Sequence, residues 1–282
     1  MSTAYDLTGA VGPAAAPGPT PAAAAPGPTP AGAGSTGAAW AAADPYDDAV
    51  RAGRGPLFLR RADGWLLPLE VERWCARADP ADLGILDRCE GTVLDVGCGP
   101  GRLVAELAAR GRAVLGIDVS AAAVAHTLGL GGQALRRSVF DPLPGEGRWG
   151  TVLLIDGNVG IGGDPLALLR RTAALLVPGG LLIAETLPVD VDERAEVEVV
   201  GLPQAPGTGR AFPWARLGTP ALLGYAGREG WRTAGQWTAG GRSFVALRSR
   251  SASSSAEPPK STAVISSQRS RYPCAERLVA DR

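Results

Sequence analysis

The sequence has few of the residues that build metal sites, disulfide frameworks and membrane spans. It contains one histidine, one lysine and four cysteines among 282 residues. The cysteines form no C-x-x-C pair, which disfavours a zinc site or a disulfide framework and favours a reducing cytoplasm. No run of about 18 apolar residues occurs, so a membrane span is not expected. Basic and acidic residues balance at 28 each, which gives no basic footprint for nucleic acid.

Both ends of the chain differ in composition from its middle. Residues 1–44 are mostly Ala, Pro and Gly without a basic residue, which disfavours a secretory signal and predicts a disordered arm. Residues 249–282 are rich in Ser and Arg with little apolar periodicity, and we expect a second disordered tail. Between them, we expect residues 45–89 to form an N-terminal cap subdomain and residues 90–248 the main domain.

The most informative segment is VLDVGCGPGRL, which runs from Val93 to Leu103. It is typical of a buried strand, a glycine-rich turn and a helix, and such a turn offers bare backbone N–H groups to a nucleotide-like ligand. Its glycines follow a G-x-G-x-G spacing, whereas a dinucleotide fingerprint requires G-x-G-x-x-G. Asp95, at the end of the strand, would repel a pyrophosphate but could hold an ammonium group. The pattern therefore favours a ligand with a cationic end.

This segment resembles motif I of the class I S-adenosylmethionine-dependent methyltransferases. Asp118 follows Asp95 by 23 positions, and this spacing supports the resemblance. The resemblance implies S-adenosylmethionine as the cofactor, because it carries an amino-acid ammonium and a sulfonium. It also implies a Rossmann-like α/β fold: a mostly parallel seven-stranded sheet with helices on both faces and a C-terminal antiparallel hairpin.

The pattern of apolar residues also indicates an α/β fold. Apolar runs alternate with segments of helical periodicity, which predicts a parallel sheet joined by right-handed crossovers. The body ends in a predicted helix over about 218–228 and two strands around 231–237 and 242–247. Before the glycine turn, residues 56–67 predict two short strands around Asp63-Gly64. The apolar runs occupy 92–96, 113–117, 134–139, 151–155 and 179–184.

Several residues are candidates for holding the cofactor. Asp118 ends the second predicted strand, where a carboxylate can accept hydrogen bonds from both ribose hydroxyls; alternatively, it lies at the N-terminus of the next helix. Phe140 and Asp141 resemble the segment that meets adenine, although Asp141 could simply start a turn while Phe140 fills the core. The expected cofactor-binding set is Asp95, Gly97, Cys98, Gly99, Gly101, Asp118, Val119, Phe140, Asp141 and Asp156.

The candidate catalytic residues follow the fourth and fifth predicted strands. Asp156 and Asn158 are expected to face the ligand crevice and place the methyl donor and acceptor. Alternatively, the surrounding glycines only allow a tight loop over the cofactor. Their segment departs from the Asp/Asn-Pro-Pro-Tyr motif of enzymes that methylate amino groups of nucleobases or glutamine. Glu185 could act as a base or fix a loop, and His126 lies away from the expected acceptor side.

Residues 188–216 form a predicted insertion before the last helix. Phe212 and Trp214 could wall an acceptor pocket, or the segment could be a charged, solvated loop anchored by one Trp. Together the patterns predict methyl transfer from S-adenosylmethionine to a small-molecule acceptor, with no metal, nucleic-acid or membrane partner. The alternatives are a non-catalytic cofactor-binding or interaction protein on the same fold, and an NAD(P)-dependent oxidoreductase, against which the glycine spacing argues.

Overall fold

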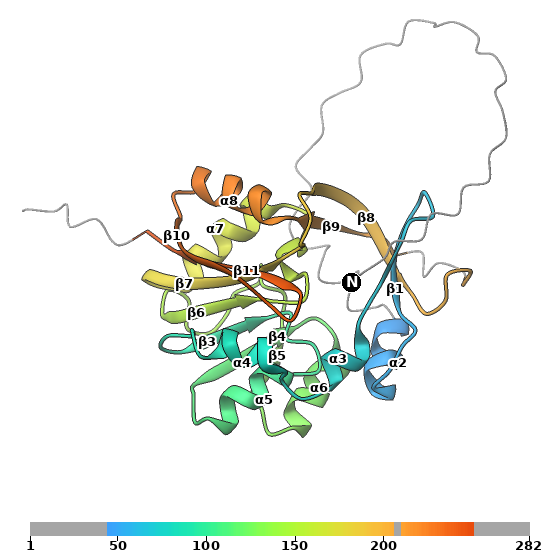
Figure 1. The fold of residues 1–282 in the computed structure, drawn as a ribbon. Helices are drawn as coiled ribbons and strands as arrows, with labels where there is room; N and C mark the ends of the chain where they lie inside the picture. Colours follow the sequence, from blue (N-terminus) through green and yellow to red (C-terminus); the bar gives the residue numbers. More distant parts are fainter. Residues whose placement is uncertain (1–43, 206–209, 251–282) are drawn as a thin grey trace, which may run out of the picture. The chain divides into compact units, whose positions relative to one another are not determined.

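The computed structural model describes residues 44–205 and 210–250, and its largest element is a seven-stranded sheet. Five strands run parallel, namely β5 (Ala134–Arg136), β4 (Val114–Asp118), β3 (Val93–Val96), β6 (Trp149–Leu154) and β7 (Leu176–Thr186). Two antiparallel strands complete it, β11 (Arg242–Arg248) beside β7 and β10 (Arg232–Ala239) at the edge. The order is β10-β11-β7-β6-β3-β4-β5. The predicted fold class, including the C-terminal hairpin, is confirmed (Figure 1).

Apolar side chains on both faces of this sheet are buried by helices. Val152 and Leu154 of β6 belong to one apolar cluster with residues of α7 (Pro165–Leu175) and α8 (Thr219–Arg228). The intervening Leu153 belongs to a second cluster with residues of α4 (Pro80–Leu86) and α5 (Arg102–Ala109). Because successive side chains of a strand point to opposite faces, a strand buried on both sides is an unbroken apolar run. This is why the sequence pattern located these strands.

Local signals fix where the helices begin. The Asp164 carboxylate accepts hydrogen bonds from Leu166 N and Ala167 N at 3.0 and 3.1 Å, and Pro165 occupies the first turn of α7. Ser120 caps α6 (Ala121–Gly129) in the same way. Within the described residues, no helix is long and apolar enough to cross a membrane.

A second, four-stranded antiparallel sheet joins two distant segments of the chain. It has the order β2-β1-β8-β9, with β2 (Leu66–Pro68), β1 (Phe58–Arg61), β8 (Asp192–Val200) and β9 (Phe212–Leu217). The hairpin predicted around Asp63-Gly64 is confirmed. The interpretation of 188–216 as a solvated loop is wrong, because most of its described residues are paired strands. The alternation of Ala195, Val197 and Val199 with charged residues was an available strand signal.

Two helices from the N-terminal region pack with this small sheet. α2 (Asp44–Ala52) and α3 (Val71–Cys75) contribute Tyr46, Val50 and Val71 to an apolar cluster with strand residues such as Val199 and Phe212. Ala122 and Ala123 of α6 belong to the same cluster, which therefore joins the N-terminal helices and the small sheet to a helix of the main domain. The tails expected at 1–44 and 249–282 lie outside the described residues, apart from their innermost positions.

Candidate active site

The glycine turn connects β3 to α5 and is anchored to the neighbouring strand. Gly97 N and Cys98 N donate to Ile117 O at 2.8 and 3.0 Å. Gly97, Gly99 and Gly101 have φ of 69°, 53° and 90°, in the region that side chains disfavour. A Cβ at Gly101 would overlap the Thr127 side chain. The turn therefore requires glycine and offers bare backbone to a ligand.

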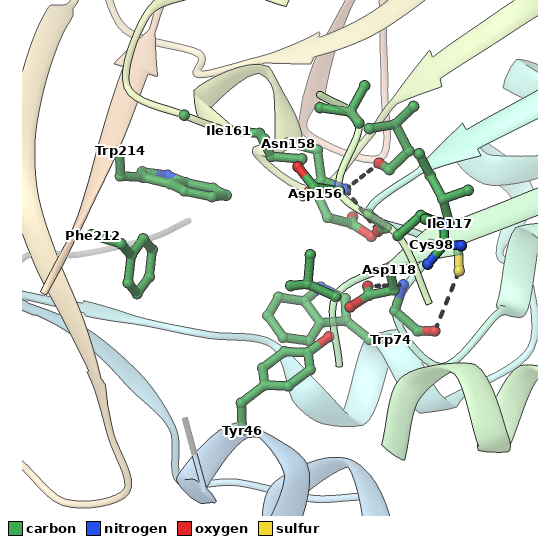
Figure 2. Close-up of a pocket in the computed structure, with 18 of the residues that line it drawn as sticks. Tyr46, Trp74, Cys98, Ile117, Asp118, Asp156, Asn158, Ile161, Phe212 and Trp214 are labelled. Atoms are coloured by element: carbon green, nitrogen blue, oxygen red, sulfur yellow. Dashed lines mark hydrogen bonds between the residues drawn. The ribbon is translucent and has the colours of Figure 1, made fainter. Parts of the chain in front are cut away.

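A pocket opens at this turn, where β3, β4 and β6 end (Figure 2). It encloses about 940 Å³ of space, its open mouth included. The main sheet and the loops that follow its strands supply the residues of the turn, those around Asp118 and Phe140, and those from Asp156 to Gly162. A second wall comes from α2, α3 and the small sheet with its adjoining loop. That second wall contains Tyr46, Leu59, Leu69, Trp74, Phe212, Pro213 and Trp214.

Asp118 lies at the end of β4 and lines the pocket. Its Oδ2 accepts from Gly99 N at 2.9 Å and its Oδ1 accepts from Ser120 N at 2.8 Å, which ties the glycine turn to the start of α6. Burial raises the pKa of Asp118 to about 6, although these backbone N–H groups oppose the rise. Each carboxylate oxygen has a second lone pair, so Asp118 retains capacity for a ligand hydroxyl.

Asp95 lies in β3 just before the turn, and the structure buries it rather than placing it in the pocket lining. Within residues 44–205 and 210–250, its Oδ2 has no hydrogen-bond partner. Burial raises its pKa to about 7; Arg102 opposes this rise, whereas the carboxylates of Asp156 and Asp118 add to it. An unsatisfied buried carboxylate oxygen is uncommon in folded proteins and indicates a strained or functional position.

Cys98, Val119 and Phe140 line the pocket, but Asp141 does not. The Cys98 side chain packs with Val104 and Ala134, and burial raises the pKa of its thiol well above the usual range. Asp141 is exposed, and its Oδ2 accepts from Ser138 N at 3.0 Å. The geometry of Asp141 therefore matches the turn interpretation, and this turn carries Phe140 into the pocket.

Asn158 and Asp156 both line the pocket, and each is held by specific contacts. Asn158 Nδ2 donates to Val96 O at 2.9 Å and to Gly97 O at 2.8 Å, so its amide fixes the start of the glycine turn. The backbone of Asp156 has a φ of 58°. No other non-glycine residue in 44–205 or 210–250 has a positive φ. Strained backbone of this kind concentrates at functional sites.

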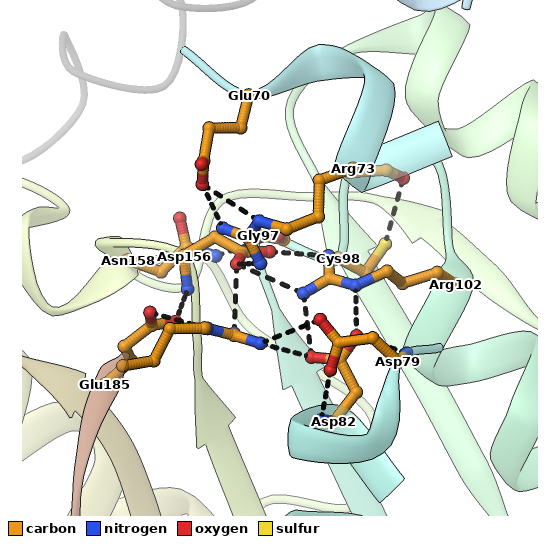
Figure 3. Close-up of polar contacts among 12 residues, drawn as sticks. Glu70, Arg73, Asp79, Asp82, Gly97, Cys98, Arg102, Asp156, Asn158 and Glu185 are labelled. Carbon is orange, nitrogen blue, oxygen red and sulfur yellow. Dashed lines mark hydrogen bonds and ion pairs between the residues drawn. The ribbon is translucent and has the colours of Figure 1, made fainter. Parts of the chain in front are cut away.

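The Asp156 carboxylate contacts three arginines (Figure 3). It lies 2.8 Å from Arg73 Nη1, 2.6 Å from Arg102 Nη1 and 3.3 Å from Arg242 Nη2. Burial by itself would raise the pKa of Asp156, but the three guanidinium groups outweigh it, and the pKa is lowered. Asp156 is therefore ionised and fully engaged, which makes it a poor proton acceptor.

Asp82 and Glu185 also belong to this network. Asp82 is fully buried and accepts from Arg102 Nε at 2.8 Å and from Arg242 Nη1 at 2.7 Å. Burial opposes the ionisation of Asp82, but the two arginines lower its pKa to about 2. Glu185 accepts from Arg242 Nε and from Asp156 N, each at 2.8 Å. Glu185 is not part of the pocket lining, and its contacts fit the loop-fixing interpretation.

Sequence reasoning missed several residues of the site. Arg102 follows the last glycine of the turn, but nothing in the pattern indicated that it is buried between two carboxylates. Tyr46 and Trp74 line the pocket from helices that precede the glycine turn in sequence, and neither residue belongs to a motif that predicts this position. His126 lies outside the lining, with Nδ1 2.8 Å from Pro100 O. No group of three or more potential metal ligands occurs within the described residues.

Comparisons with known proteins support the family that the motif suggested. A family profile described as a methyltransferase domain matches residues 70–217, slightly more than half of the chain. Among curated proteins, none matches the sequence. A solved S-adenosylmethionine-dependent methyltransferase from Bacteroides fragilis, in complex with S-adenosylhomocysteine, is 21% identical with a TM-score of 0.62, covering 74% of this chain and 96% of that one.

A second structure is less similar. The 1,6-didemethyltoxoflavin-N1-methyltransferase from Burkholderia thailandensis is 18% identical with a TM-score of 0.46, and the match covers 61% of this chain and 78% of that one. The first structure supports the fold that the strand order already shows. The family is carried by the profile match, whose residues include the glycine turn, Asp118 and Asp156. The chain therefore belongs to the methyltransferase-domain family and is an S-adenosylmethionine-dependent methyltransferase.

Proposed function

We propose that this protein transfers the methyl group of S-adenosylmethionine to a small-molecule acceptor bound in the pocket. The observation that carries the proposal is the position of the small sheet, which together with α2 and α3 forms a second wall of the pocket. A pocket bounded in this way suits a compact molecule. A protein or nucleic-acid acceptor would present an exposed loop or a strand, which requires an open groove, often with basic side chains along it.

The residues present fit the proposed methyl donor. The glycine turn leaves backbone free for the amino-acid end, and Asp118 is placed to accept from ribose hydroxyls. The unsatisfied oxygen of Asp95 would be compensated by an ammonium group nearby. Val119 and Phe140 supply apolar surface for adenine. In this proposal, Asp141 shapes the turn that carries Phe140 and does not touch the cofactor.

The protein's main contribution to the reaction is positioning. Bound S-adenosylmethionine supplies an activated methyl group: the acceptor's lone pair forms the bond to the methyl carbon, and the carbon–sulfur electron pair returns to sulfur. Any proton on the acceptor's nucleophile leaves to water. Holding the two reactants in line can contribute roughly 7–11 kcal/mol. We assign Asn158 and Asp156 to this positioning, since Asn158 fixes the turn and Asp156 anchors three arginines beside it.

Turnover distinguishes this proposal from its alternatives. S-adenosylmethionine carrying a radioactive methyl group is incubated with the protein and a bacterial extract, which is then separated by size. We expect a labelled low-molecular-mass product that chromatography separates from S-adenosylmethionine and that the extract alone does not form, and none with the Asp118→Ala variant. Label confined to protein or nucleic acid would contradict a small-molecule acceptor. Binding of S-adenosylmethionine without any transfer would favour a non-catalytic binding protein.

We also infer that the protein acts in the reducing cytoplasm. Cys75, Cys89 and Cys98 are all free thiols, and the last two are buried. Burial raises the pKa of Cys89 to about 12, which keeps this thiol protonated and unreactive. Fractionation of the producing cell, with the protein detected by antibody, tests the location. Recovery from the medium or from an oxidising compartment would contradict it.

A further inference from the structure

We propose that the methyl acceptor is an uncharged, planar aromatic molecule held between Trp74 and Trp214. This inference rests on the proposed function, because it concerns the aromatic wall of the same pocket. It is carried by the aromatic side chains of α2, α3 and β9 and by the engagement of nearly every charged group in the lining.

Two aromatic pairs line the pocket from segments far apart in the sequence. Phe212 and Trp214, both on β9, meet edge to face with ring centroids 6.1 Å apart and an interplanar angle of 85°. Tyr46 of α2 and Trp74 of α3 have ring centroids 6.3 Å apart at 43°. Figure 2 shows the two pairs on two sides of the same cavity.

Within each pair, one ring supports the other. Phe212 and Tyr46 are only 2% and 4% exposed, whereas Trp214 and Trp74 are partly exposed. The two tryptophans therefore present most of the aromatic surface to the cavity, and the buried rings restrict their movement. Leu59, Leu69 and Ile161 add further apolar lining. An apolar lining that includes two indole rings suits an aromatic ring, which gains stacking contacts that a saturated ring does not.

The charged groups of the lining leave little to bind an ionic acceptor. Asp156 is paired with three arginines, and Arg102 is paired with both Asp82 and Asp156. Asp118 accepts from two backbone N–H groups and is assigned to the cofactor. Apart from Arg137, the lining therefore offers a charged acceptor no partner to offset its lost hydration.

Arg137 is the lining residue that most favours an anionic acceptor. It is exposed, its Nη1 reaches only Arg136 O at 3.5 Å, and no ion pair of its side chain is recorded in the described residues. Its backbone N, however, donates to Asp118 O at 2.9 Å, which places it on the cofactor side of the pocket. We therefore assign the aromatic wall, and not Arg137, to acceptor recognition, and the experiment includes an anionic probe.

Three probes that share one carbon skeleton test this inference. Calorimetry measures binding of 2-naphthol, its saturated analogue decahydro-2-naphthol, and 6-hydroxy-2-naphthoate to the full chain saturated with S-adenosylhomocysteine. We expect 2-naphthol to bind at least about tenfold more tightly than either of the others, equivalent to about 1.4 kcal/mol. Equal binding of the saturated analogue would overturn the aromatic part, and tighter binding of the naphthoate would overturn the uncharged part. Absence of 2-naphthol binding overturns the whole inference.

Matched tryptophan variants locate the binding surface. Trp214→Leu and Trp74→Leu should each weaken 2-naphthol binding about tenfold, whereas Trp214→Phe should retain it within about threefold. Trp149→Leu is the control, since Trp149 lies on β6 outside the lining, where its Nε1 donates to Pro144 O. Unchanged 2-naphthol affinity in Trp214→Leu and Trp74→Leu would contradict the inference.

Cofactor binding separates the failure of this inference from that of the proposed function. Each variant is first titrated with S-adenosylhomocysteine alone, and normal affinity shows that it has folded with an intact turn. If the unaltered protein fails to bind S-adenosylhomocysteine, the proposed function is wrong. If it binds S-adenosylhomocysteine but not 2-naphthol, only the aromatic acceptor is wrong.

Discussion

Replacing Asp95 by asparagine removes a buried carboxylate charge, which has few favourable contacts in the protein without a bound ligand. Asp95 is 2% exposed, and its Oδ2 has no hydrogen-bond partner among the described residues. Its pKa rises from the ordinary value of 3.8 to about 7 in the folded protein, mainly because of burial. Between these values the folded protein holds a proton that the unfolded chain has lost. Asp95 therefore stabilises the fold most at low pH, and this contribution is lost as the pH rises toward 7.

The magnitude follows from the pH interval. At about 1.4 kcal/mol per pH unit, with the slope falling as the pH nears 7, the loss between about pH 5 and pH 7 is roughly 2 kcal/mol. The asparagine side chain of the Asp95→Asn variant does not titrate, so the variant avoids this loss. We compare the free energy of unfolding of the variant with that of the unaltered protein at each pH. We expect this difference to shift in favour of the variant by roughly 2–3 kcal/mol as the pH rises from about 5 to 8. A domain of this size would show this as a difference of several degrees in Tm.

Urea unfolding at a series of pH values measures this difference. Asp190→Asn is the control, because Asp190 is exposed and no partner of its side chain is recorded. A pH-independent difference between Asp95→Asn and the unaltered protein would refute the reasoning. At about pH 8, S-adenosylhomocysteine should stabilise the unaltered protein more than the variant, because its ammonium group would compensate the Asp95 charge. Equal stabilisation of the two would remove Asp95 from the ammonium role.

Three further substitutions test the turn and the ion-pair network. Gly101→Ala places a Cβ against Thr127 at φ of 90° and should lower both Tm and S-adenosylhomocysteine affinity, measured by scanning calorimetry and titration. Asn158→Ala removes two hydrogen bonds to the turn and should cost about 1–3 kcal/mol in urea unfolding; no loss would exclude the anchoring role. Asp156→Ala leaves three arginines facing one another and should cost about 3–5 kcal/mol in the same assay, whereas a near-neutral effect would mean that water compensates them.

The sequence predicted the main sheet because its strands are buried on both faces. Leu94 and Val96 meet one cluster while Val93 meets the other, so that Asp95 alone interrupts the apolar residues of β3. The glycine turn was equally visible, since its φ values restrict it to glycine. The third strand proved shorter than predicted, ending at Arg136, because the chain turns at Ser138–Asp141. The sequence pattern therefore predicts a strand or turn when neighbouring residues alone determine its structure.

The second wall of the pocket depends on pairings between distant residues. β1 pairs with β8 through contacts such as Leu59 with Val199. The local sequence of either strand does not predict which strand it pairs with. The ion-pair network is similar, because Arg242 and Asp82 are 160 positions apart. Glu185 was a plausible base from its place at a strand end, but Arg242 occupies both of its oxygens. Sequence spacing can place a carboxylate at a sheet edge but cannot identify the cation that neutralises it.

The most direct test of this account is a calorimetric titration of the full chain with S-adenosylhomocysteine and, separately, with NAD. We predict saturable binding of one S-adenosylhomocysteine per chain, weakened at least about tenfold by Asp118→Ala, and no saturable binding of NAD. Saturable binding of NAD in the absence of S-adenosylhomocysteine binding would contradict the assignment of the glycine turn to the methyl donor.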